Sequence, residues 1–163
     1  MLEAAVLAEV RPRHILFLCV QNSARSQLAE GIARFLAPAG VTVSSAGSSP
    51  AFVRPQAIQV LKEIGIDISL HRSKSIDEID AASVDAVVTL CAEEVCPVFL
   101  GQAVRLHWSL PDPAKAPGDE NARLDAFRAT RDELFRRLKL LFEGWGSAQQ
   151  GTGLPNEPSE VKR

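Results

Sequence analysis

The sequence predicts a parallel α/β fold, in which a β-sheet is covered on both faces. Short apolar segments typical of buried strands alternate with segments whose apolar residues recur at helical spacing, and the connections between them are short. The chain has 163 residues, of which 46% are hydrophobic, and this fits one domain with a substantial core. In such sheets ligands bind beyond the carboxyl ends of the strands. The loops that follow the strands are therefore the first place to look for function.

Four short segments are predicted strands. The first is the apolar run HILFLCV at residues 14–20, and the second covers residues 41–45 and is closed by Gly47. The third, at residues 86–90, reads AVVTL, and the fourth covers residues 104–108. Cys19 lies near the end of the first segment, Cys91 and Cys96 follow the third, and Asp112 follows the fourth.

Helices are predicted between and after these strands. Residues 26–37 carry apolar side chains at helical spacing, and residues 55–64 start with a proline and are followed by Gly65. Ser75 is a predicted N-cap, because acidic residues follow it in the first turn. A long amphipathic helix is predicted over residues 121–145, with an apolar stripe that favours a role in the core.

The organisation predicted for the chain is one domain between two tails. Residues 1–12 are interpreted as an N-terminal extension and residues 13–145 as the domain. Residues 146–163, rich in Gly, Pro, Ser and Gln, are predicted to be a disordered tail. The N-terminus does not resemble a signal peptide, and no apolar run approaches the ~18 residues that span a bilayer. We therefore expect a cytoplasmic protein, and the net charge of −2 gives no indication of a nucleic-acid partner.

The three cysteines are the residues most informative about function. An odd number of cysteines in a chain expected to be cytoplasmic argues against a structural disulfide framework. Each one, considered alone, is most simply a small buried hydrophobic residue. The neighbours of Cys19, Cys91 and Cys96 favour a different interpretation.

Cys19 ends the first predicted strand, and a helix follows after a short loop. The loop can turn its N–H groups toward one point, where the helix N-terminus adds partial positive charge and Arg25 adds a full charge and paired donors. Such a site binds an oxyanion and stabilises a nucleophilic thiolate. Ser26 can donate to the sulfur, and Asn22 can hold a left-handed conformation. The predicted oxyanion-binding residues are Val20, Gln21, Asn22, Ser23, Ala24, Arg25 and Ser26. The alternative is a buried cysteine with an arginine nearby by chance.

The pattern C-x5-R-S after the first strand resembles the signature of the low-molecular-weight tyrosine phosphatase superfamily. The resemblance extends over about residues 13–145. It implies a three-layer α/β/α fold with a four-stranded parallel sheet, and a general acid in an Asp-Pro pair. Asp112, followed by Pro113, matches that acid. An Asp-Pro pair considered alone would indicate a simple turn.

Cys91 and Cys96 lie five positions apart, directly after a predicted strand. Their sulfur atoms can approach bonding distance if the segment is helical or partly unwound. A metal half-site and a pair of inert thiols are the alternatives. A zinc site needs further ligands of similar type, and His14, His71 and His107 show no paired spacing.

The cysteine pair resembles the redox segment of arsenate reductases of the thioredoxin-coupled class, which share the phosphatase fold. Residues 87–91, the pair His107-Trp108, residues 112–114, and residues 65–69 with His71 are also similar to that class. Two features depart from it. Ala24 stands where the class often has a further cysteine, and the separation between Cys91 and Cys96 is shorter than in some members.

This second resemblance implies a reaction. The Cys19 thiolate attacks arsenate held by Arg25, with Asp112 as general acid. A disulfide then forms between Cys19 and Cys91 and passes to Cys91 and Cys96, where thioredoxin or a similar thiol reductant reduces it.

The same resemblance implies the partners and cofactors. We expect arsenate as substrate, phosphate or sulfate as competing oxyanions, and no organic cofactor. We also expect a monomer, and the net charge and the lack of a long apolar run predict that it binds neither nucleic acid nor membrane. A potassium ion is expected near the loop, and the positions matched to its ligands are Asn22, Glu30, Ser45 and Asp67.

Two other functions stay open at this point. The first is a low-molecular-weight phosphatase with a cysteine-phosphate intermediate, in which Cys91 and Cys96 are bystanders or give redox protection. The second is a module that binds oxyanions or senses redox state without turnover, which the set of Cys19, Arg25 and Asp112 argues against. The chain has no tyrosine, and small residues and Lys115 follow the Asp-Pro pair, where phosphatases of this superfamily usually have aromatic residues. A small inorganic oxyanion needs no such aromatic wall.

Overall fold

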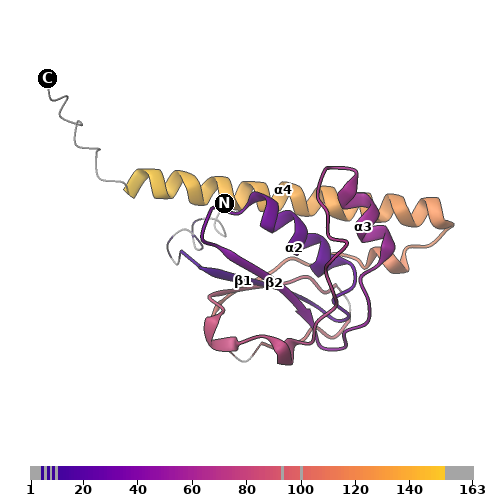
Figure 1. The fold of residues 1–163 in the computed structure, drawn as a ribbon, viewed down its shortest axis with the longest axis horizontal. Coiled ribbons are helices and arrows are strands. Elements are labelled where there is room, and N and C mark those ends of the chain that lie inside the picture. Colours follow the sequence, from indigo (N-terminus) through magenta and orange to yellow (C-terminus); the bar gives the residue numbers. More distant parts are fainter. Residues whose placement is uncertain are drawn as a thin grey trace, which may run out of the picture.

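The computed structural model describes residues 5, 7, 9, 11–92, 94–99 and 101–152 (Figure 1). Four strands form one parallel sheet in the order β2-β1-β3-β4, which confirms the expected four-stranded sheet. The strands are β1 (His14–Cys19), β2 (Thr42–Gly47), β3 (Ala86–Thr89) and β4 (Val104–His107).

Three helices that the structure describes along their whole length lie on one side of this sheet (Figure 1). They are α2 (Arg25–Leu36), α3 (Pro55–Lys62) and α4 (Glu120–Thr152). The first two agree closely with the predicted segments, whereas α4 continues beyond residue 145, where the helix was expected to end. The remainder of the predicted tail, residues 153–163, lies outside the described residues.

The core occupies both faces of the sheet, because the central strand β1 is buried on both sides. Ile15 and Phe17 pack with the helices, while Leu16 and Leu18 point to the opposite face. That face is covered by Phe99 and by the segment that contains the short 3-10 helices η1 (Ile76–Glu78) and η2 (Ala81–Ser83). The arrangement therefore has three layers, as the α/β/α prediction requires.

Two further observations concern the chain outside the sheet. Leu7, in the segment interpreted as an N-terminal extension, is fully buried in the core beneath the helices. The predicted N-cap at Ser75 is confirmed, and it forms a reciprocal capping box with Glu78.

Within the part of the chain that the structure describes, no helix is both long and apolar enough to cross a membrane. The domain boundaries at residues 12 and 145 stay predictions.

The parallel sheet brings the candidate residues together at one edge. Because all four strands run in the same direction, their carboxyl ends meet there. Cys19 lies opposite Gly47 in the register of β1 and β2, and Leu18 lies opposite Thr89 in that of β1 and β3. The loops that follow β1, β3 and β4 therefore converge on Cys19.

Candidate active site

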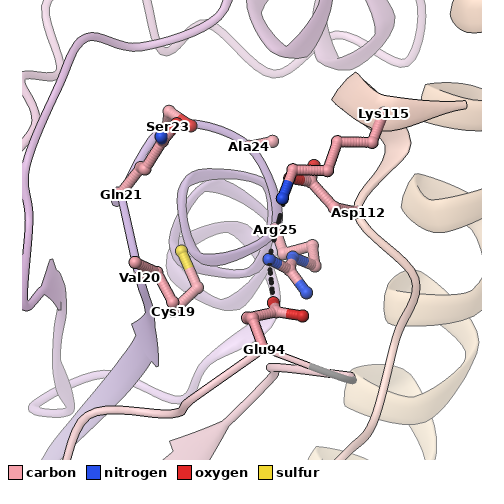
Figure 2. Close-up of a pocket in the computed structure, with 9 residues that line it drawn as sticks. All are labelled: Cys19, Val20, Gln21, Ser23, Ala24, Arg25, Glu94, Asp112 and Lys115. Atoms are coloured by element: carbon pink, nitrogen blue, oxygen red, sulfur yellow. Dashed lines mark ion pairs between the residues drawn. The ribbon is translucent and has the colours of Figure 1, made fainter.

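A small pocket lies at this edge of the sheet (Figure 2). Its volume is about 70 Å³, well below the roughly 300–1,000 Å³ of pockets that take drug-sized ligands. A cavity of this size is suited to a small anion. The residues that line it come from the end of β1, the start of α2 and the loops after β1, β3 and β4, and they are Cys19, Val20, Gln21, Ser23, Ala24, Arg25, Glu94, Asp112 and Lys115.

The loop between β1 and α2 has its carbonyl groups bonded on the side away from the pocket. The carbonyl oxygens of Val20, Gln21 and Ser23 accept hydrogen bonds of 2.9, 3.1 and 2.9 Å from backbone amides in residues 49–54. Since the N–H and C=O of a planar peptide unit point in opposite directions, the loop amides are turned toward the pocket. This is the geometry of an anion-binding nest.

Asn22 fixes the shape of this loop. Its φ is 50°, which confirms the predicted left-handed conformation. Its side-chain Oδ1 accepts hydrogen bonds from the backbone N–H of Lys74 at 2.8 Å and from the Gln27 amide at 3.0 Å, and its carbonyl oxygen accepts one from the Ser73 hydroxyl at 2.6 Å. Asn22 is fully buried, so these bonds connect the loop firmly to the neighbouring segments.

Gly47, at the end of β2, allows the loop to lie against the sheet. A Cβ atom at this position would lie 2.3 Å from the carbonyl oxygen of Val20 and 2.9 Å from the backbone nitrogen of Asn22. Both contacts are with backbone atoms, which cannot rotate away. The loop and the strand therefore come this close only because residue 47 is glycine.

The Cys19 thiol lies at the base of the pocket, and its side chain is nearly buried, with 2% of the residue exposed. It is a free cysteine, and its Sγ lies 2.8 Å from the Ser26 hydroxyl, as expected from the sequence. The Asn22 amide donates to the same hydroxyl oxygen at 2.7 Å, which leaves the Ser26 proton free to point at the sulfur. Among the described residues, no side chain caps the start of helix α2, so its N–H groups face the site uncapped.

Arg25 is buried and joins the three loops of the site. Its Nη1 donates hydrogen bonds to the carbonyl oxygens of Leu110 at 2.9 Å and Leu90 at 3.4 Å. Its Nη2 forms an ion pair with Glu94 and lies 3.9 Å from the Asp112 carboxylate. The guanidinium is thus held in place by backbone groups on one side and presents its other side to the pocket.

Asp112 lies at the mouth of the pocket, across from Cys19 (Figure 2). It is the N-cap of the short helix η3 (Pro113–Lys115), and its Oδ1 accepts a hydrogen bond of 3.0 Å from the backbone N–H of Ala114. This cap fixes the side chain near the guanidinium while leaving Oδ2 available. Asp112 lies in a turn and also borders the site, so its position suits both a turn residue and a general acid.

Cys91 and Cys96 are joined in a disulfide, with a Cα–Cα distance of 5.5 Å. The described residues between the two cysteines are irregular rather than helical, which fits the partly unwound form of the segment rather than the helical one. Cys91 is buried, whereas Cys96 is partly exposed. The backbone N–H of Leu90 donates a hydrogen bond to the carbonyl oxygen of Leu18, which continues the pairing of β1 with β3. In this register Leu90 lies opposite Cys19, and Cys91 is the next residue along the chain.

Glu94 and Lys115 also line the pocket, and the sequence interpretation did not include them among the site residues. Burial alone would raise the pKa of Glu94, but hydrogen bonds from its own backbone N–H and from Arg25 outweigh that effect and lower it. The carboxylate is therefore charged near neutral pH. The sequence feature that could have indicated Glu94 as a site residue is its position between the two cysteines of the C-x4-C segment. Spacing alone does not predict which way its side chain points.

The four positions matched to a potassium ion are not arranged as one ligand shell. Glu30 and Ser45 are bonded to each other at 2.6 Å, but the Glu30 carboxylate also lies 3.5 Å from the ammonium of Lys74. Asp67 is engaged by the backbone N–H of Ser69. A lysine ammonium beside Glu30 would repel a cation, so these residues do not fit a bound potassium ion.

The fold and the site together are those of an enzyme that uses a cysteine to act on small oxyanions. The buried thiol ends a strand, a nest of amides and an arginine surround it, and a carboxylic acid borders it. The chain belongs to the low molecular weight phosphotyrosine protein phosphatase family, whose model matches residues 14–150.

Several proteins to which this chain is similar are arsenate reductases. The arsenate reductase of Halalkalibacterium halodurans is 44% identical over 131 residues, which cover 79% of this chain and 94% of that protein. A solved arsenate reductase in the phosphate-binding state is 33% identical, with a TM-score of 0.68 over 80% of this chain and 97% of that one. A thioredoxin-dependent arsenate reductase from Corynebacterium glutamicum is 29% identical, with a TM-score of 0.61 over 92% of this chain and 70% of that one.

Proposed function

We propose that this protein is an arsenate reductase that draws the two electrons for each turnover from its own cysteines. The observation that carries the proposal is the pairing of a free Cys19 thiol in an anion-sized pocket with a disulfide between Cys91 and Cys96 beside it. A phosphatase needs the first feature but does not need the second. The similarity to arsenate reductases supports the same conclusion.

In the first step, the Cys19 thiolate attacks arsenic and forms a sulfur–arsenic bond. The loop amides and Arg25 hold the arsenate oxygens, and their charges stabilise the negative charge of the transition state. One arsenic–oxygen bond breaks, and Asp112 gives its proton to the departing hydroxide, which leaves as water. The Ser26 hydroxyl donates to the sulfur and so favours the thiolate before attack.

In the second step, the Cys91 thiolate attacks the sulfur of Cys19. A disulfide forms between Cys19 and Cys91, and the electrons of the sulfur–arsenic bond pass to arsenic, which leaves as arsenite. The Cys96 thiolate then attacks Cys91, which frees Cys19 as a thiolate and leaves the Cys91–Cys96 disulfide. The structure corresponds to the protein after this transfer, because it holds the same disulfide and a free Cys19.

Regeneration of the dithiol needs a thiol reductant outside the protein. Thioredoxin or a similar dithiol protein supplies two electrons and two protons, and it reaches the pair through the partly exposed Cys96 rather than through buried Cys91. Phosphate and sulfate compete with arsenate for the same pocket. The protein acts as a monomer in the cytoplasm, where such reductants keep thiols reduced.

The test is arsenite formation in a single turnover by reduced wild type and three variants. Cys19→Ser should form no arsenite and show no phosphatase activity. Cys96→Ser should release about one arsenite per protein and stop as a Cys19–Cys91 disulfide, because that cysteine acts only after release. Cys91→Ser should stall before release, without that disulfide. Peptide mapping by mass spectrometry identifies the disulfide in each case.

A phosphatase assay on the same proteins distinguishes an arsenate reductase from a phosphatase. Cys91→Ser and Cys96→Ser should both keep any hydrolysis of aryl phosphates that the wild type shows, since that chemistry uses Cys19, Arg25 and Asp112 alone. If both variants match wild type in many rounds of arsenate reduction, the relay is wrong. If wild type hydrolyses aryl phosphates briskly and reduces no arsenate, the protein is a phosphatase.

A further inference from the structure

The disulfide loop places a carboxylate where the substrate anion should bind. Glu94 lies inside the short ring that the Cys91–Cys96 bond closes, and its side chain points into the pocket toward Arg25 (Figure 2). One of its oxygens forms an ion pair with Nη2 of Arg25, on the side of the guanidinium that faces the pocket. A carboxylate paired with arginine offers the same charge and geometry as two oxygens of a tetrahedral oxyanion.

The rest of the surroundings hold Glu94 in this position. Its other carboxylate oxygen accepts a hydrogen bond of 3.3 Å from the backbone N–H of Ala92, within the same ring. On the opposite side of the Arg25 guanidinium, Nη1 donates hydrogen bonds to two backbone carbonyl oxygens. Arg25 therefore cannot rotate to bind Glu94 and a second anion at the same time.

We propose that Glu94 is an internal competitor of the oxyanion that acts only while Cys91 and Cys96 are joined. In the disulfide state its carboxylate occupies Arg25 and excludes arsenate or phosphate. This inference rests on the proposed function, because it assumes that the pocket binds an oxyanion. It adds a control of that site by the redox state of the protein.

The disulfide is what makes the competitor effective. It fixes the ends of the segment at a Cα–Cα distance of 5.5 Å and so restricts the positions open to Glu94. When a thiol reductant gives two electrons and two protons to the sulfur–sulfur bond, two thiols form and the ring opens. The chain between them gains conformational freedom, so holding Glu94 on Arg25 becomes less favourable. The anion then displaces the carboxylate.

The consequence is an ordered cycle in which regeneration precedes substrate binding. An oxidised protein that still bound arsenate would form a sulfur–arsenic adduct at Cys19 without a free Cys91 thiolate to resolve it. Exclusion of the anion by Glu94 avoids that dead-end adduct. It also keeps abundant phosphate out of the pocket while the reductant works.

The experiment measures the affinity for inorganic phosphate by calorimetric titration in both redox states. The disulfide state, with Cys19 free, and the fully reduced state are each verified by mass spectrometry. Oxidised wild type should bind phosphate at least about tenfold more weakly than reduced wild type, since the anion must replace a charge-assisted contact. In Glu94→Gln this difference should fall to within about twofold. Glu94→Asp keeps the charge on a shorter side chain, and the difference should shrink there as well.

The matched control is Glu143→Gln, which removes the same charge from an exposed position on α4. It should keep the full redox difference. Equal affinities in the two states of wild type, or an undiminished difference in Glu94→Gln, would overturn the inference. Absence of phosphate binding in every state would overturn the oxyanion site and this inference with it. A redox-dependent affinity in a protein that reduces no arsenate would support the inference and refute the proposed reaction.

Discussion

Arg25 is the residue through which the separate loops of the site are held in one geometry. Its guanidinium spans carbonyl groups from the loops after β3 and β4 while its own backbone starts helix α2. A planar fork with five donors can serve both the protein and an anion at once, which the single ammonium of a lysine cannot do in the same way. The orientation of the guanidinium is thus fixed by the fold before an anion enters.

Asp112→Asn should slow the first chemical step by about 10²–10⁴-fold, the usual effect of losing a general acid. The amide keeps the cap on η3 and the size of the side chain, so the local fold and phosphate binding should change little. Arsenite formation in a single turnover, measured with saturating arsenate, gives the rate. A variant that turns over normally near neutral pH would show that Asp112 is only a turn residue.

The site residues differ in how far the sequence alone could predict them. Cys19 and Arg25 belong to one continuous motif, and the motif fixes their mutual position because the loop between them is short. Asp112 was identifiable from its Asp-Pro context at the end of a strand. The direction of the Glu94 side chain depends on a ring closed by two other residues, so no local pattern in the sequence reveals it.

At the scale of elements, helix α3 is attached to α4 by a network of charges as well as by packing. Glu63, just past the end of α3, accepts hydrogen bonds from Arg128 at 2.8 Å and from Arg131 at 2.7 Å. The hydrogen bond from Arg128, helped by Arg131 and opposed by burial, lowers the pKa of Glu63 from 4.5 to about 2. The carboxylate of Glu63 therefore favours the folded state wherever it is ionised.

Glu63→Gln should remove a pH-dependent part of the stability. Because the folded pKa lies below 4.5, the contribution of Glu63 is fully present above that pH and is lost as the pH falls toward 2. The melting temperature of the variant should lie below that of wild type at about pH 6, and the gap should narrow at about pH 3. Glu143→Gln serves as the control, since its carboxylate is exposed and lies 4.0 Å from the Lys139 ammonium, at the limit of an ion pair. A gap that is independent of pH would contradict this account.

The secondary structure was largely predictable, because apolar periodicity and capping residues determine it locally. The end of α4 was not. Gly144 and Gly146 indicated a stop near residue 145, but the helix continues to Thr152. Each glycine costs a helix only about 1 kcal/mol relative to alanine, which weakens a long helix without ending it. The order of the strands in the sheet also could not be read from the sequence, because short crossovers of the right hand allow more than one order.

At the scale of the whole molecule, two exposed apolar side chains lie close to Cys96 in the chain. Val95 is 90% exposed and Val98 is 75% exposed, and they flank Cys96 and Pro97 in the chain. A protein reductant must bring its own thiolate to Cys96, which lies between the two valines in the chain. These valines are therefore expected to contribute apolar contact area with the reductant.

Val98→Asp should weaken turnover supported by thioredoxin by several-fold or more, because a charge would be buried in that contact. Turnover with a small dithiol should change much less, since a small reductant needs no protein surface. Leu140→Asp is the matched control, because Leu140 is also an exposed apolar residue but lies on α4. Equal losses with both reductants would indicate damage to the disulfide loop itself and would contradict a docking role.

The hydrogen bonds behind the Cys19 loop have a thermodynamic consequence for ligand binding. Every carbonyl from Val20 to Ser23 is bonded to a neighbouring segment, and Gly47 lets the loop rest directly on β2. The conformational entropy of this loop is therefore lost during folding rather than when an anion arrives. Once Arg25 is free, an oxyanion enters a preorganised shell, and its affinity should carry little penalty for ordering the protein.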